Sequence, residues 1–227
     1  MLRVGLTGGL GSGKSTAARL FAQRGAHILE ADAIGRAMMQ PGHAVYDAIV
    51  EHFGKGILLP DGQLDRAALA RISFAEGRVE ELNAIVHPAV IAQQAKLAEE
   101  IFAHDQNSVV IVESALIFET RYSGGTETTS STPWRARFDC LILVTAPEEA
   151  KVERYIQRIA AGAPLSAEQH AKLAEEARRR LAQQIPDEQK APLCDFILHN
   201  NELVELEQQV DELWPMLWFS SASNHKH

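Results

Sequence analysis

A glycine-rich segment near the amino terminus has the residue types and spacing that suit phosphate binding. Residues 8–15 read GGLGSGKS, which fits the pattern G-x-x-x-x-G-K-[ST]. In this pattern backbone N–H groups surround phosphate oxygens, the lysine reaches the β and γ phosphates, and the final hydroxyl binds Mg²⁺. The sequence therefore predicts a site for a nucleoside triphosphate and Mg²⁺. The residues expected to contact the nucleotide are Gly8, Gly9, Gly11, Ser12, Gly13, Lys14, Ser15 and Thr16.

The carboxylate of Asp32 is placed to receive a proton during phosphoryl transfer. Asp32 follows the second predicted strand, at the carboxyl edge of the sheet, where open α/β folds assemble their sites. It could accept the proton of an attacking hydroxyl there, as a catalytic aspartate does in other kinases. Alternatively, it is only the N-cap of a helix that begins at Ala33. Both interpretations stay open, because one aspartate can serve both purposes.

Arg36 lies four residues after Asp32, so the two side chains share one face of the predicted helix. The simpler interpretation is a surface ion pair worth about a few tenths of a kcal/mol. The alternative is a guanidinium that binds a substrate phosphate near the acceptor hydroxyl. The sequence does not distinguish an exposed arginine from one that lines a cleft.

Cationic side chains concentrate between residues 147 and 184, in a stretch that we expect to be mostly helical. Most of them should lie on solvated helix faces. Phosphoryl transfer concentrates negative charge on the transferring group, so one or two arginines of a closing lid could stabilise that charge strongly. The candidates are Arg154, Arg158 and Arg180, with Arg154 proposed as catalytic and the other two as substrate-binding.

Glu113 ends the apolar run at 109–112, where P-loop proteins often place a carboxylate that helps to hold Mg²⁺. Glu113 could equally cap the strand or pair with a neighbouring lysine. The nine histidines show no spacing typical of metal ligands. Ser15 and Glu113 are therefore the predicted ligands of Mg²⁺.

Parallel strands must bring these residues together. The first thirty residues read as strand, glycine loop, helix and strand, with the strands at 4–6 and 26–29. The apolar runs at 109–112 and 141–144 are typical of central strands covered on both faces by helices, and 196–198 offers another short strand. We therefore predict an α/β fold, the three-layer P-loop NTPase fold with a parallel central sheet.

Helical segments supply the rest of the predicted single domain, residues 1–227. Apolar residues at helical spacing between the second and third strands indicate an inserted helical lobe. The predicted parts are a core at about 1–34, 106–146 and 190–219, a helical lobe at about 35–105 and a lid at about 147–189. The small, polar residues 123–133 should form a surface loop. A last helix is expected at 203–217, with 220–227 frayed.

Composition limits the possible partners and the location. The chain has 227 residues, with 22 Lys and Arg against 30 Asp and Glu, hence a net charge of −8. Such a chain is an improbable binder of nucleic acid, which needs a broad basic surface. Two cysteines suggest a reducing compartment, and no apolar run approaches the roughly 18 residues of a membrane span. Without a recognisable leader, we expect a cytoplasmic monomer or small homo-oligomer that does not bind membranes.

Beyond the loop, an ordered series of segments resembles the dephospho-coenzyme A kinase family, P-loop enzymes of the last step of coenzyme A synthesis. The glycine loop alone is shared by thousands of NTPases, whereas the series is specific. The segments are LTGGLGSGKST at 6–16, EADAIGRAMMQPG at 30–42, FGKGILLPDGQLDRAALARISFA at 53–75, LNAIVHPAV at 82–90, ESALIFE at 113–119, RLAQQIP at 180–186 and CDFILHNNE at 194–202.

The resemblance implies a reaction and roles for individual residues. It implies ATP- and Mg²⁺-dependent phosphorylation of the ribose 3′-hydroxyl of dephospho-CoA, which gives CoA and ADP. By the same resemblance, Asp32 corresponds to the family's proposed general base, while Arg36 and His87 fall in coenzyme-facing elements. Asn200 falls near the end of the chain that binds adenine.

The sequence departs from the family pattern in three places. Glu30 stands where the family has an aspartate, and Glu113-Ser114-Ala115 lacks the proline that is usual before the Leu-rich segment. The stretches 122–137 and 159–178 look longer than usual.

Two alternative functions stay open. One is another small-molecule kinase acting on a nucleoside or nucleotide, since fold does not fix substrate. The other is a regulatory P-loop NTPase, although the sequence lacks an N-K-x-D guanine-binding segment.

Overall fold

The computed structural model describes residues 1–75, 77–119 and 134–223. The chain divides into two compact units. Of the described residues, the sheet unit comprises Met1–Leu29, Glu100–Glu119 and 134–223, and the helical unit comprises 30–75 and 77–99. The loop predicted at 123–133 and residues 224–227 lie outside the described residues. In the described ranges, no helix is long and apolar enough to cross a membrane.

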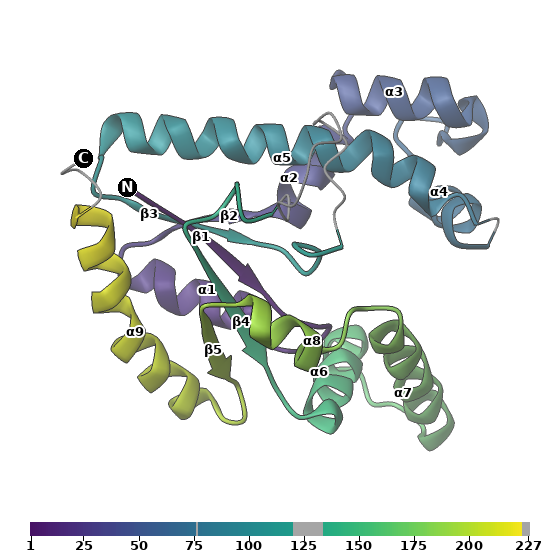
Figure 1. Ribbon diagram of the computed structural model, residues 1–227. Helices are drawn as coiled ribbons and strands as arrows, with labels where there is room; N and C mark the ends of the chain where they lie inside the picture. Colours follow the sequence, from purple (N-terminus) through teal and green to yellow (C-terminus); the bar gives the residue numbers. More distant parts are fainter. Residues whose placement is uncertain (76, 120–133, 224–227) are drawn as a thin grey trace. The chain divides into compact units, whose positions relative to one another are not determined.

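Five strands form the sheet, in the spatial order β2-β3-β1-β4-β5 (Figure 1). The central β1 pairs in parallel with β3 and with β4, and β4 pairs in parallel with β5. The predicted parallel α/β architecture is therefore confirmed. Its strands are β1 (Leu2–Thr7), β2 (His27–Glu30), β3 (Val109–Glu113), β4 (Cys140–Thr145) and β5 (Phe196–His199).

The register of the sheet brings several strand ends to one edge. Leu6 pairs with Glu113 on β3, so Glu113 lies beside the end of β1, just before the glycine loop. On the other side of β1, Thr7 pairs with Leu143, and Thr145 of β4 pairs with His199. The carboxyl ends of β1, β3, β4 and β5 therefore meet where the glycine loop begins, as parallel topology requires.

Helices α1 (Lys14–Gln23) and α9 (Leu203–Ser223) pack against each other and against the sheet (Figure 1). Their apolar side chains join strand residues such as Val4 and Ile142 in one buried cluster, which anchors the helix that follows the glycine loop. The predicted apolar stripe of the last helix is buried there: Leu206, Val210, Leu213 and Leu217.

Helix α9 is longer than the sequence suggests, since it continues to Ser223. The expectation that the chain frays from residue 220 is therefore wrong for 220–223. The cause is tertiary: the buried Ser221 hydroxyl donates to the carbonyl oxygen of Asn107 at 2.8 Å, and the N-terminal ammonium of Met1 donates to the carbonyl oxygen of Ser221 at 2.8 Å. These contacts hold a small, polar helix end that has little helix propensity of its own.

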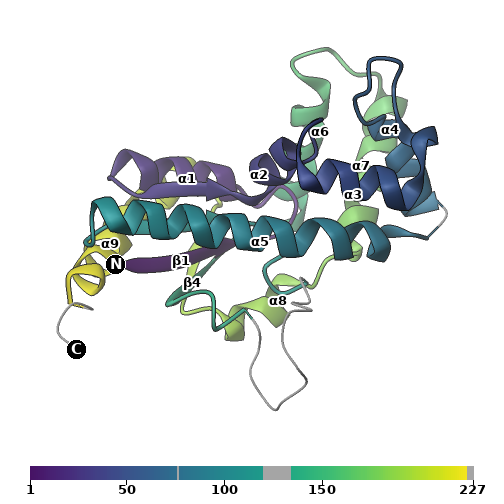
Figure 2. The same cartoon turned by 90° about the horizontal axis from the view of Figure 1, so that it is seen from above.

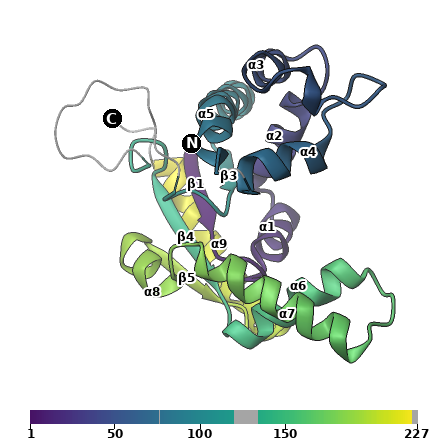
Figure 3. The ribbon, with the colours of Figure 1, turned by 90° about the vertical axis from the view of Figure 1, so that its right-hand side faces the viewer.

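The predicted helical stretch at 147–184 is confirmed as a pair of helices, α6 (Glu148–Ala160) and α7 (Ala167–Ala182), which lie side by side (Figure 3). Val152, Tyr155 and Ile156 of α6 pack against alanines of α7 in a separate small core. After α7 come the one-turn helix α8 (Asp187–Lys190) and the 3₁₀ turn η3 (Ala191–Leu193).

The helical unit has its own apolar core, formed mainly by α3 and α5 (Figure 2). Asp65 caps α4 by accepting hydrogen bonds from the amides of Ala67 and Ala68. The elements are α2 (Ala31–Met38), α3 (Ala44–Phe53), η1 (Lys55–Ile57), α4 (Arg66–Ala70), η2 (Arg71–Ala75) and α5 (Val79–His104), of which residues up to Glu99 belong to this unit.

Candidate functional site

The glycine loop joins the end of β1 to the start of α1 and contains backbone N–H groups without a protein acceptor among the described residues. Gly11 and Gly13 have φ of 70° and 93°, in the left-handed region that favours glycine. Within the described part of the chain, the N–H groups of Gly11, Gly13 and Ser15 donate to no protein acceptor. Unpaired N–H groups at a helix amino terminus, where the helix dipole is positive, form an anion-binding site.

A side chain at either glycine would collide with its surroundings. A Cβ on Gly13 would overlap Nδ2 of Asn200, and a Cβ on Gly11 would overlap the carbonyl oxygen of Lys151. The backbone of α6 therefore runs against the loop, and glycine is required at both positions for space as well as for conformation.

Lys14 and Ser15 begin α1 and lie close to the loop and to β3. The ammonium of Lys14 donates to the carbonyl oxygen of Gly9 at 3.0 Å. The hydroxyl of Ser15 donates to Oε1 of Glu113 at 3.0 Å. The structure thus brings together the two predicted ligands of Mg²⁺, one at a helix start and the other at a strand end.

The donor set at Ser15 and Glu113 fits a magnesium ion. Mg²⁺ prefers oxygen ligands and is usually bound through one or two carboxylates, several waters and substrate phosphates. Among the described residues, no group of three or more His, Cys, Asp or Glu side chains is suited to hold a metal by itself. A metal at this place would therefore depend on phosphate oxygens to complete its coordination.

Arg154 and Asn200 brace the loop from two different elements. The buried Asn200, which follows β5, donates from Nδ2 to the carbonyl oxygen of Ser12 at 2.8 Å. Arg154 of α6 donates to the carbonyl oxygens of Asn200 at 2.9 Å and Gly11 at 3.4 Å. Both predicted site residues therefore lie at the loop, where they contact its backbone.

Arg158 and Arg180 both approach the ring of Tyr155 but do not contact the loop in the described structure. Both guanidinium groups are exposed, and each lies 5.6 Å from the centre of the Tyr155 ring. Arg180 also donates to Oε1 of Glu176 at 2.7 Å. The two arginines thus form an exposed cationic group on α6 and α7.

Asp32, Arg36 and His87 belong to the helical unit. Helix α2 begins at Ala31 with Glu30 as its N-cap, so the interpretation of Asp32 as the N-cap of a helix starting at Ala33 is wrong. Asp32 instead lies in the first turn, where the helix dipole favours a carboxylate. Asp32 and Arg36 are both exposed and have no ion-pair partner among the described residues, so the predicted ion pair is absent there. His87 is half-buried on α5.

Gln184 also contacts the loop, although its residue type does not mark it as a site residue. Its Oε1 accepts a hydrogen bond from the N–H of Leu10 at 2.9 Å, so the end of the α6–α7 helical pair is tied to the loop. The signal was available, because Gln184 lies in the segment RLAQQIP, which resembles a family motif.

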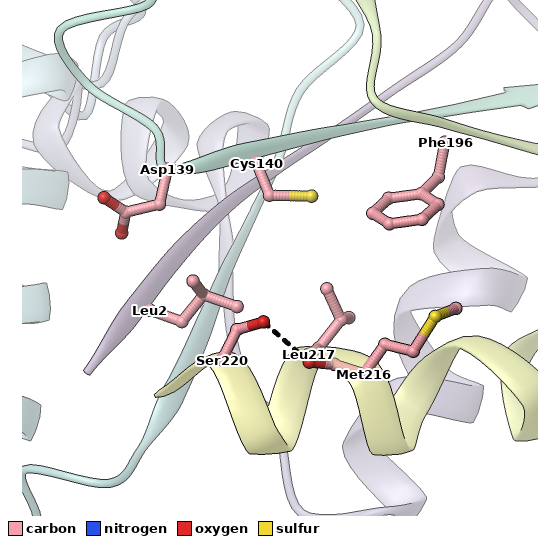
Figure 4. A pocket seen from close by; sticks show the side chains of 7 residues that line it. All are labelled: Leu2, Asp139, Cys140, Phe196, Met216, Leu217 and Ser220. Atoms are coloured by element: carbon pink, nitrogen blue, oxygen red, sulfur yellow. Dashed lines mark hydrogen bonds between the residues drawn. The ribbon is translucent and has the colours of Figure 1, made fainter. Parts of the chain in front are cut away.

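A cavity of about 400 Å³ lies elsewhere in the sheet unit. Its lining comes from the amino-terminal ends of β1, β4 and β5, and from α9 (Figure 4). The glycine loop begins at the carboxyl ends of the strands, so this cavity is at the opposite edge of the sheet and does not belong to the site. Burial raises the pKa of the Cys140 thiol on its wall to about 12, so this thiol stays protonated and unreactive at neutral pH.

Comparison with known proteins identifies related sequences. The model of one protein family, described as dephospho-CoA kinase, matches residues 2–205. A dephospho-CoA kinase from Thermobifida fusca is 36% identical over 220 residues, which cover 96% of both chains. A dephospho-CoA kinase from Mycolicibacterium paratuberculosis is also 36% identical, over 94% of this chain. The chain spans only 47% of that second, longer relative.

A solved structure shows how far the similarity of the fold extends. The crystal structure of the protein TT1252 from Thermus thermophilus aligns with a TM-score of 0.69 and 27% identity. The alignment covers 95% of this chain and 96% of the other. The similarity therefore extends over both units and is not confined to the glycine loop.

Proposed function

The chain belongs to the dephospho-CoA kinase family, and we propose that the glycine loop, Lys14 and Asp32 carry out the reaction of that family in this protein. The enzyme is a phosphotransferase of coenzyme A biosynthesis that uses ATP as phosphoryl donor. The acceptor is the ribose 3′-hydroxyl of dephospho-CoA, and the products are CoA and ADP.

The unpaired N–H groups at the start of α1 are the observation that carries this proposal. Together with the ammonium of Lys14, they bind the β and γ phosphates of ATP and stabilise the charge that develops on the transferring group. The ammonium exchanges its hydrogen bond with Gly9 for bonds to phosphate oxygens. A protein with a net charge of −8 can thus bind an anionic nucleotide, because the attraction is local.

Ser15 and Glu113 are the residues that would hold Mg²⁺. When bound, the metal neutralises part of the negative charge on the phosphate oxygens. The hydroxyl and the carboxylate fix its place beside the loop, since both come from ordered element ends.

Asp32 is the proposed general base for the 3′-hydroxyl. Its carboxylate is exposed and has no ion-pair partner in the described residues, so it is free to accept a proton. Arg36, one turn further along α2, and His87 on α5 are proposed to bind the coenzyme. Arg158 and Arg180 are proposed to bind substrate phosphates, since their guanidinium groups are exposed.

Arg154 and Asn200 hold the loop in shape, and both remain candidates for contact with ATP. Asn200 is proposed to lie beside the adenine, while the Arg154 guanidinium stabilises the transferring phosphoryl group. In the described structure Arg154 donates to the loop carbonyl oxygen of Gly11 and Asn200 donates to that of Ser12, which supports a place close to the nucleotide.

A coupled assay with Asp32→Asn tests the assignment of the base. We expect kcat to fall by about 10²–10⁴-fold, the usual contribution of a general base, while ATP binding is retained. Asp47→Asn is the matched control, because Asp47 is likewise an exposed aspartate in the first turn of a helix. Full activity of Asp32→Asn would contradict the assignment. Wild-type enzyme that consumes ATP equally with and without dephospho-CoA would contradict the function itself.

An acceptor panel distinguishes this function from the alternatives. The family match favours dephospho-CoA over a nucleoside or nucleotide acceptor and over a regulatory NTPase. The cytoplasmic location, the monomeric or small homo-oligomeric state and the division into core, lobe and lid stay predictions.

A further inference from the structure

A buried ion pair lies next to the glycine loop, between three elements of the sheet unit. The ammonium of Lys151 on α6 lies 2.5 Å from Oδ2 of Asp187, the first residue of α8. The same oxygen accepts a hydrogen bond of 2.6 Å from the hydroxyl of Thr145, at the end of β4. The side chains of Lys151 and Asp187 are each only 11% exposed.

Such a pair needs an explanation other than stability. Removing two charges from water costs several kcal/mol for each ion, so a buried pair seldom stabilises a fold more than apolar residues would. A buried pair does fix the relative position of the elements that carry the two charges. Separating the charges costs more free energy in a medium of low dielectric constant than in water. Here the pair fixes the distance of α6 from the end of β4.

The glycine loop contacts both helices that the ion pair joins, α6 and α8. The backbone of α6 at Lys151 leaves no room for a side chain on Gly11. A Cβ on Gly9 would lie 3.6 Å from Oδ1 of Asp187, in ordinary contact. Three residues after Lys151, Arg154 reaches the carbonyl oxygens of Gly11 and Asn200. A shift of α6 would therefore move both the loop and the guanidinium that braces it.

We propose that Asp187 is a positioning residue for phosphoryl transfer, which holds Lys151 and Thr145 so that α6, Arg154 and the glycine loop keep one geometry. The proposal rests on the proposed function, because it concerns the same loop. In this role Asp187 need not touch ATP or the acceptor. It acts through Lys151, and a displacement of the reacting groups by about 1 Å can cost about 10²-fold in rate.

The test compares Asp187→Asn with Thr145→Val and with a control, all in the full chain. Asp187→Asn keeps the size of the side chain but removes its charge. Thr145→Val removes only the hydrogen bond from Thr145 to Asp187. Glu149→Gln is the control, because Glu149 pairs with Arg178 from the same α6 but is 81% exposed. For each variant, kcat, the KM values, the stoichiometry of ATP binding and the melting temperature are measured.

We expect kcat of Asp187→Asn, expressed per ATP-binding site, to fall by about 10–100-fold, with KM for dephospho-CoA changed less than threefold. Thr145→Val should show a smaller fall in kcat, and Glu149→Gln none. A merely structural role would lower the melting temperature and the number of binding sites but leave kcat per site unchanged, which would overturn the proposal. If Asp187→Asn does not fold, Thr145→Val decides by the same criterion. Failure of wild-type enzyme to form CoA would instead overturn the proposed function.

Discussion

The hydroxyl of Ser15 and the carboxylate of Glu113 lie 3.0 Å apart although 98 residues separate them in the chain. The register of β1 and β3 produces this proximity, because Leu6 pairs with Glu113 two residues before the loop begins. A hydroxyl and a carboxylate thus lie beside the N–H groups that are proposed to bind phosphate. This arrangement makes the proposed metal requirement testable through one residue.

Replacing Glu113 by alanine should raise the Mg²⁺ concentration that gives half-maximal activity by tenfold or more, because one of few protein ligands is lost. The measurement is the rate of CoA formation across a Mg²⁺ titration at saturating ATP. Glu148→Ala, in which an exposed glutamate at the start of α6 is removed, is the control. An unchanged Mg²⁺ requirement in Glu113→Ala would exclude this carboxylate as a ligand.

Gly13→Ala should abolish ATP binding, since the new methyl group overlaps Nδ2 of Asn200. Overpacking costs about 1–3 kcal/mol and a left-handed alanine about 1–2 kcal/mol. Combining it with Asn200→Ala removes the overlapping atom, so the unfolding free energy should partly recover. Gly162→Ala, at φ 85° with nothing within 4 Å, isolates the cost of the backbone alone. Urea denaturation of these three variants beside the wild type shows whether overlap or strain dominates.

The pair formed by Lys190 and Glu119 should behave as a buried ion pair. The fully buried ammonium lies 3.0 Å from Oε1 of Glu119, without the alignment of a hydrogen bond. Lys190→Met leaves a carboxylate of 20% exposure unpaired, which should cost about 3–5 kcal/mol of unfolding free energy. Adding Glu119→Leu should restore most of that loss. Arg178→Met, at a half-exposed pair, should cost less than about 1 kcal/mol.

Acid should weaken the interaction between His52 of α3 and Glu81 of α5. Hydrogen bonds from Arg78 and His52 hold the pKa of Glu81 at about 2, below its ordinary value of 4.5. A lowered pKa means that the folded state favours the carboxylate. The contribution of Glu81 to stability is therefore complete above about pH 4.5 and is lost as the pH falls towards 2.

Carboxyl NMR titration checks this assignment. Arg78→Gln removes the charged hydrogen-bond donor that contributes most to the lowered pKa of Glu81, so this pKa should rise towards 4.5. Glu51, an exposed glutamate on α3, serves as an internal reference in the same spectra. A pKa of Glu81 that is the same in both proteins would show that Arg78 does not cause the shift.

The sequence predicts the sheet well because the strands are short, continuous apolar runs. VVIV and LILV are buried on both faces of the sheet, which is the environment that such runs require. The loop was equally predictable, because its glycines, lysine and serine are adjacent in the chain. In both cases the deciding information is local.

Contacts made across the chain were beyond prediction. The sequence predicts that Arg154 is a cation of a lid. The spacing of residues along one helix does not reveal that Arg154 binds the carbonyl oxygens of Gly11 and Asn200. Asp187, in a segment rich in charged residues, looks solvated in the sequence. Its burial arises only when α6, α8 and β4 come together.

The lack of space at Gly11 limits which loops this protein can accept. The general motif permits any residue at this position, yet the carbonyl oxygen of Lys151 excludes even a methyl group. A loop transplanted from another NTPase would have to displace α6 before it could close on a nucleotide. In laboratory evolution, sequence changes at position 11 should therefore survive only together with compensating changes in α6, so that loop and helix vary as one unit.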